Sequence, residues 1–187
     1  PILVRMNAVI LATGDELVLG QNVDTNSAWL SGQLAARGVM TLYHKTAGDD
    51  LKAIIAIIRE AAQAGELVIL TGGLGPTRDD LTREALASVL EVSLEPHEPS
   101  LERIRSFFRK LDRPVPETNN VQALCPRGAT MLDNDWGTAP GILATIGTAR
   151  VFALPGVPSE MKGMFERHIV PAILGQSGRT ILVEKVR

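Results

Sequence analysis

"LVILTGGLGPTRDDLTREA", residues 67–85, places an apolar run, a glycine-rich loop and a helical pattern in direct succession. The four apolar residues 67–70 are typical of a strand that is covered on both faces. Three closely spaced glycines follow, and glycine lets a backbone turn sharply or approach a ligand. A helix is predicted from Thr82 to about Leu90. The stretch therefore predicts one strand, loop and helix unit of a parallel sheet.

The same succession recurs on the N-terminal side of this stretch. Strands are predicted at 4–13 and 39–47, and helices at about 24–37 and from Asp49 or Asp50 to Gly65. Alternating strands and helices are typical of a parallel sheet with helices on both faces. The sequence thus predicts a doubly wound α/β domain.

The second half of the chain is less regular. It predicts a helix at 100–111, a loop at 112–120, strands at 129–132, 141–145 and 150–154, and a last helix after residue 160. The strands 141–145 and 150–154 are expected to form a hairpin. We expect one domain over residues 1–175, while the segment 176–187 contains a strand at 179–186 that leads outward, toward a further domain.

Composition excludes several classes of function. A net charge of −2 gives no electrostatic reason to expect a nucleic-acid partner. The longest apolar run is far shorter than the roughly 20 residues of a membrane span, so no membrane segment is expected. The single cysteine, Cys125, cannot form an internal disulfide, which favours a reducing cytoplasm.

Polar or glycine-rich loops follow four of the predicted strands. They are residues 13–26, 47–50, 71–80 and 154–160. In parallel α/β sheets, ligands bind outside the carboxyl ends of the strands, near the point where the strand order reverses. We therefore expect these loops to gather at one edge and to form the site.

The glycine loop is the first candidate element of that site. The amides of Gly72, Gly73 and Gly75, with the start of the next helix, would make a concavity for a phosphate. The hydroxyls of Thr77 and Thr82 would add donors. The alternative is a tight turn between strand and helix that binds no ligand.

Adjacent acids are the second candidate element. Of Asp79 and Asp80, we expect one to cap the following helix and the other to face the site with Asp49 and Glu16. Carboxylates beside a phosphate imply a divalent cation, Mg²⁺ or Mn²⁺, between them. The alternatives are that both aspartates serve the helix start, and that Asp15 and Glu16 belong to a polar loop.

Five motifs in this order resemble the N-terminal domain of the CinA family, the competence/damage-inducible proteins. They are "TGDELVLGQNVDTNSAWL" (13–30), "TAGDD" (46–50), "TGGLGPTRDDLTREA" (71–85), "GTAPG" (137–141) and "LPGVPSEM" (154–161). The family is related to molybdopterin-binding domains of the MoaB/MogA type. The resemblance implies a three-layer α/β/α sandwich with a mostly parallel sheet, the MogA-like fold, and a homodimer or homotrimer.

The resemblance also implies an activity and a site. It implies hydrolysis of ADP-ribose to AMP and ribose 5-phosphate with a divalent metal (Mg, Mn or Co), with Asp49 and Asp80 as catalytic residues. Glu16, Asp49 and Asp80 would hold the metal, and the residues expected at the substrate are Gly72, Gly73, Gly75, Thr77, Thr82, Asn119, Gln122, Thr138, Ser159 and Lys162.

Two other functions stay open. One is a molybdopterin-binding or adenylylating module of molybdenum cofactor biosynthesis, which would share the anion loop but would not hydrolyse ADP-ribose. The other is a domain that only drives oligomerisation of a larger protein.

Overall fold

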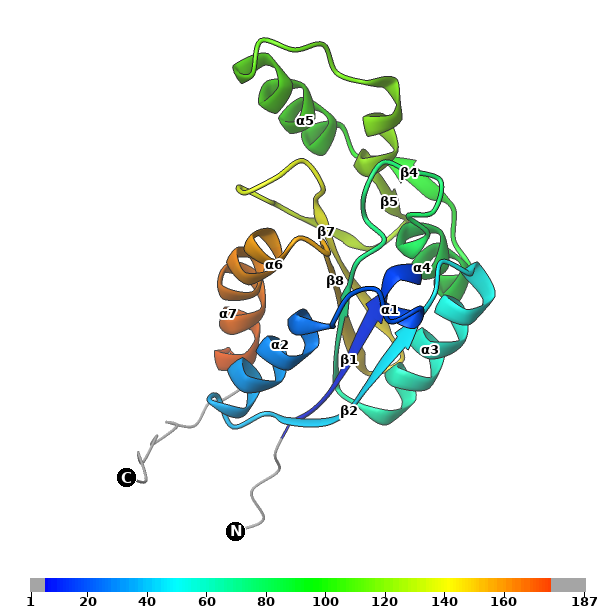
Figure 1. The fold of residues 1–187 in the computed structure, drawn as a ribbon, viewed down its shortest axis with the longest axis vertical. Helices are drawn as coiled ribbons and strands as arrows, with labels where there is room; N and C mark the ends of the chain where they lie inside the picture. Colours follow the sequence, from blue (N-terminus) through cyan, green and yellow to red (C-terminus); the bar gives the residue numbers. More distant parts are fainter. Residues whose placement is uncertain (1–5, 176–187) are drawn as a thin grey trace.

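A six-stranded sheet forms the centre of the computed structural model, which describes residues 6–175 (Figure 1). The strand order is β2-β1-β3-β8-β7-β6. Strands β2, β1, β3 and β8 run parallel, and β7 and β6 are antiparallel to their neighbours. The strands are β1 (Asn7–Thr13), β2 (Met40–Ala47), β3 (Leu67–Thr71), β6 (Thr130–Leu132), β7 (Gly141–Ile146) and β8 (Ala149–Leu154). The predicted strand at 179–186 lies outside the described residues.

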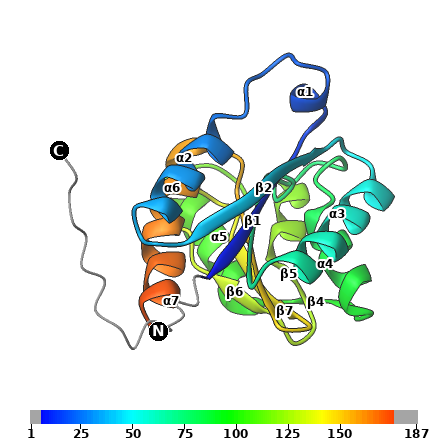
Figure 2. The ribbon, with the colours of Figure 1, turned by 90° about the horizontal axis from the view of Figure 1, so that it is seen from below.

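Helices cover both faces of the sheet (Figures 1 and 2). One face carries α2 (Thr25–Ala35), α6 (Pro158–Met164), the π-helical turn Phe165–Ile169 and α7 (Val170–Leu174). The other carries α3 (Leu51–Ala64) and α4 (Thr82–Leu90). The predicted three-layer α/β/α sandwich with a mostly parallel sheet is therefore confirmed. Within residues 6–175, no helix has the length and apolar character needed to span a membrane.

Strand β1 shows why the sheet needs both helical layers. Its residues Ala8 and Ile10 pack in the core with α2, whereas Val9 and Leu11 pack in the core with α3. All four are fully buried. A strand that is apolar on both faces can bury both only between two layers.

The helix starts depend on side-chain caps. The Asp24 carboxylate accepts a hydrogen bond from the Ser27 amide at 2.9 Å and so caps α2. Asp50 caps α3 by accepting from the Ala53 amide at 2.8 Å. Of the two aspartates considered for α3, Asp50 is therefore the cap, which leaves Asp49 for other contacts.

Several short elements do not appear in the sequence prediction. They are α1 (Asp15–Val18), a 3₁₀ helix (Glu117–Ala123) that overlaps the end of the predicted loop, and a two-stranded sheet of β4 (Leu94–Pro96) and β5 (Leu124–Pro126). The helix α1 and the strands β4 and β5, of three or four residues each, are too short to show a hydrophobic period. The helix α5 (Glu98–Lys110) starts two residues earlier than predicted, because the His97 ring accepts a hydrogen bond from the Ser100 amide.

The strand order places a switch point in the parallel part of the sheet. Strand β1 lies between β2 and β3, so the chain leaves β1 toward β2 and leaves β3 toward the β8 side of the sheet. The carboxyl ends of β1 and β3 then form the position where α/β sheets bind ligands. We call the carboxyl ends of β1, β2, β3 and β8, with the loops that follow them, the rim.

Candidate functional site

The four loops predicted to converge do meet at the rim. The Gly14 amide donates to the Ala47 carbonyl at 3.1 Å, which joins the loops after β1 and β2. The Gly72 amide donates to the Leu154 carbonyl at 3.0 Å, which joins those after β3 and β8. The expectation of a common rim is thus confirmed, because β1, β2, β3 and β8 are parallel.

Asn26 ties three of these segments together. From the first turn of α2, its amide nitrogen donates to the Gly156 carbonyl at 2.8 Å and to the Thr71 hydroxyl at 3.2 Å. Sequence reasoning missed this role, because an asparagine near a helix start is common for local reasons. Only the approach of β3 and β8 to α2 gives it long-range partners.

Packing inside the protein requires two of the loop glycines. Gly72 has φ 105°, and a Cβ built there would lie 2.5 Å from the Thr13 carbonyl oxygen. Gly73 has φ 66°, and its Cβ would lie 2.4 Å from the Thr82 hydroxyl. These glycines are needed for the turn itself, so their presence alone does not demonstrate a ligand.

Asp80 binds the glycine loop from within. Its carboxylate accepts hydrogen bonds from the Gly75 amide at 2.8 Å, the Thr77 amide at 2.8 Å and the Thr77 hydroxyl at 2.6 Å. These are donors that the sequence assigned to an external phosphate. The chain therefore supplies its own anion to this part of the loop.

Neither adjacent aspartate caps α4, so that prediction was wrong. The cap position is Leu81, and no side chain makes a capping hydrogen bond there. The Asp80 carboxylate is occupied by the loop amides, and Asp79 is exposed. The local pattern could not distinguish a cap from a loop anchor, because both use a carboxylate that accepts backbone N–H groups.

A buried arginine, absent from the predicted site, holds the other side of the loop. Arg83 Nη1 donates to the Leu74 carbonyl at 2.8 Å, and Nη2 donates to the Gly75 carbonyl at 2.6 Å. Its side chain is 1% exposed, and burial lowers the pKa of Arg83 while the charges of Glu84 and Asp80 raise it. A guanidinium suits this place because its planar fork reaches two carbonyls at once.

Asn119 and Gln122 lie behind the same loop. Gln122 Nε2 is 3.5 Å from the Leu74 carbonyl oxygen, and Asn119 Nδ2 donates to Gln122 Oε1 at 2.8 Å. Both side chains are buried. The structure therefore places these predicted substrate contacts against the loop backbone, where they support its shape.

Two polar groups at the switch point have no partner within residues 6–175. One is the amide of Gly73, and the other is the buried hydroxyl of Thr13. Gly73 lies against this hydroxyl, since a Cβ built on it would lie 3.1 Å from the Thr13 hydroxyl oxygen. The hydroxyl is fully buried, and such unsatisfied groups are uncommon in folded proteins, whereas Gly73 is half-buried and its amide can meet a ligand.

Carboxylates gather at the β2 side of the rim. The Asp49 amide donates to the Asp15 carboxylate at 2.9 Å, and the Asp15 amide approaches the Asp49 carboxylate at 3.3 Å. Burial raises the pKa of Asp49, the bond from the Asp15 amide lowers it, and the charges of Asp15, Glu16 and Asp79 raise it further. The folded protein therefore makes the ionised form of the Asp49 carboxyl less favourable than it is in water.

The three carboxylates expected to hold a divalent metal do not form one donor set. Asp80 faces the loop amides, Asp49 pairs with Asp15, and the Glu16 carboxyl lies against Gly14. In the described part of the chain, no group of three or more histidine, cysteine, aspartate or glutamate side chains is arranged to hold a metal ion. These residues therefore do not fit a preformed metal centre, and metal dependence stays a prediction.

The remaining predicted residues lie at different places around the rim. The Thr82 hydroxyl donates to the Gly72 carbonyl at 2.9 Å, and Ser159 is exposed on the first turn of α6. The Lys162 ammonium lies 5.5 Å from the centre of the Trp29 ring. Thr138 lines a cavity between α5 and the 133–140 loop, away from the switch point. The structure thus does not bring these four side chains together.

Comparison with known proteins places these features in a family. Residues 9–175 match the family described as a probable molybdopterin binding domain. A CinA-like protein of Anaeromyxobacter sp. (strain K) is 46% identical over 173 residues, 92% of this chain and 42% of that protein. A putative competence-damage inducible protein of Acetivibrio thermocellus is 42% identical over 182 residues, 97% of this chain and 44% of that protein. The chain therefore spans less than half the length of these relatives.

Solved structures extend the comparison to the fold. CinA of Thermoplasma acidophilum, described as of unknown function, superposes with a TM-score of 0.83 and 31% identity, covering 90% of this chain and 98% of that one. The molybdopterin biosynthesis enzyme MoaB of Thermus thermophilus gives a TM-score of 0.58 at 20% identity, covering 91% and 97%. At that identity the second likeness concerns the fold alone, which is the MogA/MoaB-like α/β sandwich.

Proposed function

The chain belongs to the family of probable molybdopterin-binding domains and, within it, to the CinA-like proteins, and from this premise we propose that it binds a molybdopterin-type ligand at the rim. Molybdopterin is a pterin that carries a phosphate, so the ligand needs donors for an anion. The proposed position is the switch point between β1 and β3, where α/β sheets bind ligands.

The pair of unsatisfied donors at the switch point carries this proposal. The Gly73 amide makes no hydrogen bond in the described part of the chain, and the buried Thr13 hydroxyl, which also has no partner there, lies against Gly73. A phosphate oxygen that enters beside the half-buried Gly73 could accept from its amide, and it reaches the Thr13 hydroxyl only if the atoms that bury this hydroxyl give way. The loop that presents Gly73 is fixed by Asp80 and Arg83. A loop that is already in place loses little conformational entropy when a ligand binds.

Replacing one donor tests the proposal. Thr13→Val removes the hydroxyl and keeps the branched shape, and we expect it to weaken molybdopterin binding about tenfold, the loss of one good hydrogen bond. Thr145→Val is the matched control, because Thr145 is exposed at the opposite end of the sheet. Binding is measured by titration of the purified chain. Unchanged affinity in Thr13→Val, or no binding to the parent chain, would contradict the proposal.

A second candidate function is hydrolysis of the pyrophosphate bond of ADP-ribose, and Asp49 is the observation that favours it. Burial and three neighbouring carboxylates raise the pKa of Asp49. A carboxylate with a raised pKa is a better acceptor for a proton from an attacking water. In this proposal Asp49 takes that proton at the β2 side of the rim.

Release of AMP distinguishes the second candidate from the first. The chain is incubated with ADP-ribose in the presence of Mg²⁺, Mn²⁺ or Co²⁺, and AMP is quantified over time. Asp49→Asn should abolish release, whereas Asp50→Asn keeps the helix cap and should retain it. If no AMP appears with any of the metals, the chain is not this hydrolase, and molybdopterin binding is decided by its own titration.

A further inference from the structure

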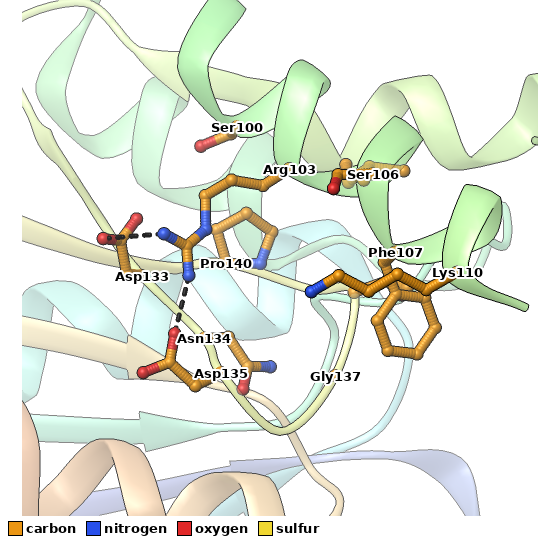
Figure 3. A pocket seen from close by; sticks show the side chains of 12 residues that line it. Ser100, Arg103, Ser106, Phe107, Lys110, Asp133, Asn134, Asp135, Gly137 and Pro140 are labelled. Atoms are coloured by element: carbon orange, nitrogen blue, oxygen red, sulfur yellow. Dashed lines mark hydrogen bonds and ion pairs between the residues drawn. The ribbon is translucent and has the colours of Figure 1, made fainter.

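A cavity of about 300 Å³ lies between α5 and the loop 133–140 (Figure 3). This loop joins β6 to β7, at the edge of the sheet opposite β2. The sheet register places it there. Leu132 pairs with Gly141, and Ile142 pairs with Ala153 near the carboxyl end of β8. The loop that joins β6 to β7 therefore emerges on the same side of the sheet as the glycine loop.

Two arginines neutralise the acids beside this cavity. Arg103 pairs with Asp133 at 3.2 Å and with Asp135 at 2.6 Å, as the dashed lines in Figure 3 show. Arg167 pairs with the same two aspartates. Two positive charges thus balance two negative charges, and this cluster leaves no net charge for a ligand.

Lys110 adds a positive charge that forms no ion pair within residues 6–175, while the Glu160 carboxylate adds a negative charge at the loop, where it accepts a hydrogen bond from Asn134 at 2.6 Å. The Lys110 side chain extends along the cavity from the last turn of α5 (Figure 3). A cation at the edge of a cavity attracts an anionic group.

An aromatic ring stands next to this charge. Phe107 is 37% exposed and lies beside Lys110 at the cavity (Figure 3). An exposed aromatic face offers a stacking surface to a planar ring. The hydroxyls of Ser106 and Thr138 also line the cavity, and neither has a partner in the described part of the chain. The volume is at the lower end of the range for ligand pockets, which suits a small molecule.

We propose that this cavity binds a small planar ring that carries one anionic group, phosphate or carboxylate, with the anion at Lys110 and the ring on Phe107. The hydroxyls of Ser106 and Thr138 then hydrogen-bond to the anion or to polar atoms on the ring. This site does not share residues with the Thr13 and Gly73 donors, so it does not depend on the function proposed for the switch point.

Binding of simple probes tests this site. The whole chain is titrated with phenyl phosphate, benzoate and cyclohexanecarboxylate, and amide chemical shifts are followed by NMR. We expect phenyl phosphate or benzoate to shift the amide signals of α5 and of the loop 133–140. The probe that binds more tightly shows whether the site prefers a phosphate or a carboxylate. Cyclohexanecarboxylate should bind at least about threefold more weakly than benzoate, because it lacks a planar face.

Matched variants separate the charge from the ring. Lys110→Gln should weaken the aromatic anion about tenfold, whereas Arg109→Gln removes the same charge one residue away and should change affinity less than about twofold. Arg109 pairs with Glu102 and does not line the cavity. Phe107→Leu should weaken phenyl phosphate and leave inorganic phosphate unchanged.

Defined outcomes would overturn the proposal. They are the absence of any shift at the cavity, equal effects of Lys110→Gln and Arg109→Gln, or equal binding of the planar and non-planar acids. Thr13→Val should leave this binding intact, so failure at the switch point and failure at the cavity are distinguished. Lys110 and Phe107 are exposed, and circular dichroism should find both variants folded.

Discussion

Asp80 shows at the scale of one residue how a carboxylate can complete a loop that resembles a ligand cradle. Its two oxygens accept from the amides of Gly75 and Thr77 and from the Thr77 hydroxyl. Hydrogen bonds to an ionised acceptor are stronger than neutral ones. The glycine loop is therefore stabilised by its own sequence, whichever ligand it meets.

Asp80→Asn should destabilise the fold by about 1–3 kcal/mol, because an amide nitrogen would face backbone donors that now share a carboxylate. The measurement is urea unfolding at pH 7. Asp79→Asn is the control, since Asp79 is adjacent and exposed, and it should change stability by less than about 0.5 kcal/mol. Equal stability of the two variants would show that the Asp80 bonds contribute nothing.

Asp49 predicts a dependence of stability on pH. Its pKa is raised in the folded chain, so its contribution to stability is present below the ordinary aspartate pKa and is lost as the pH rises through the folded value. Asp49→Asn removes a charge that the fold disfavours. We therefore expect a higher unfolding temperature for this variant at pH 7.

The difference between Asp49→Asn and the parent chain should shrink as the pH falls toward the ordinary aspartate value of 3.8. Thermal unfolding monitored by circular dichroism from pH 7 to pH 4 measures it. Glu117→Gln, which replaces an exposed acid, should show no such trend. A variant that is less stable than the parent at pH 7 would mean that ionised Asp49 stabilises the fold.

Single elements differ in how much their own sequence specifies. Helix α4 spans Thr82–Leu90 as predicted, because its apolar positions repeat at helical spacing. The small sheet of β4 and β5 was not predicted, since each strand has three residues and their pairing joins segments about thirty residues apart. The predicted loop 112–120 contains the start of a 3₁₀ helix for a similar reason: Asn119 and Gln122 are held by each other and by Leu74.

The start of α3 gives a prediction at this scale. Asp50→Ala removes the bond to the Ala53 amide and should destabilise the chain by about 1 kcal/mol. Asp50→Ser should recover most of that loss, because serine also caps helices. Chemical denaturation of the three proteins measures both effects. If Asp50→Ser is no better than Asp50→Ala, the cap is not the source of the stability.

The whole molecule combines a sheet that is buried between two helical layers with a helix, α5, that is mostly exposed. Every residue of β3 and nearly every residue of β1 is buried between two helical layers. Helix α5 instead lies beyond the sheet, near the rim, and buries only Ser100 and Ile104 (Figure 1). The oligomer implied by the family resemblance remains a prediction that sedimentation of the purified chain can test.

Hydrogen exchange should follow this division. Amides of β1 and β3 are expected to exchange slowest, at rates set by global unfolding, while those of α5 open locally and exchange at least about tenfold faster. Exchange measured by NMR at residue resolution checks the order. Protection of α5 equal to that of β3 would mean that α5 and the sheet unfold as one unit.

The sequence by itself determined the succession of long elements and the gathering of loops at one rim. Those features depend on local apolar periods and on the general geometry of parallel sheets. Only the tertiary structure decided what the polar side chains do there. Asp80 turns into its own loop, Arg83 spans two carbonyls, and Asp15 meets Asp49 from 34 positions away. Each of these roles depends on which backbone groups the packed layers bring within hydrogen-bond distance, and no local pattern carries that information.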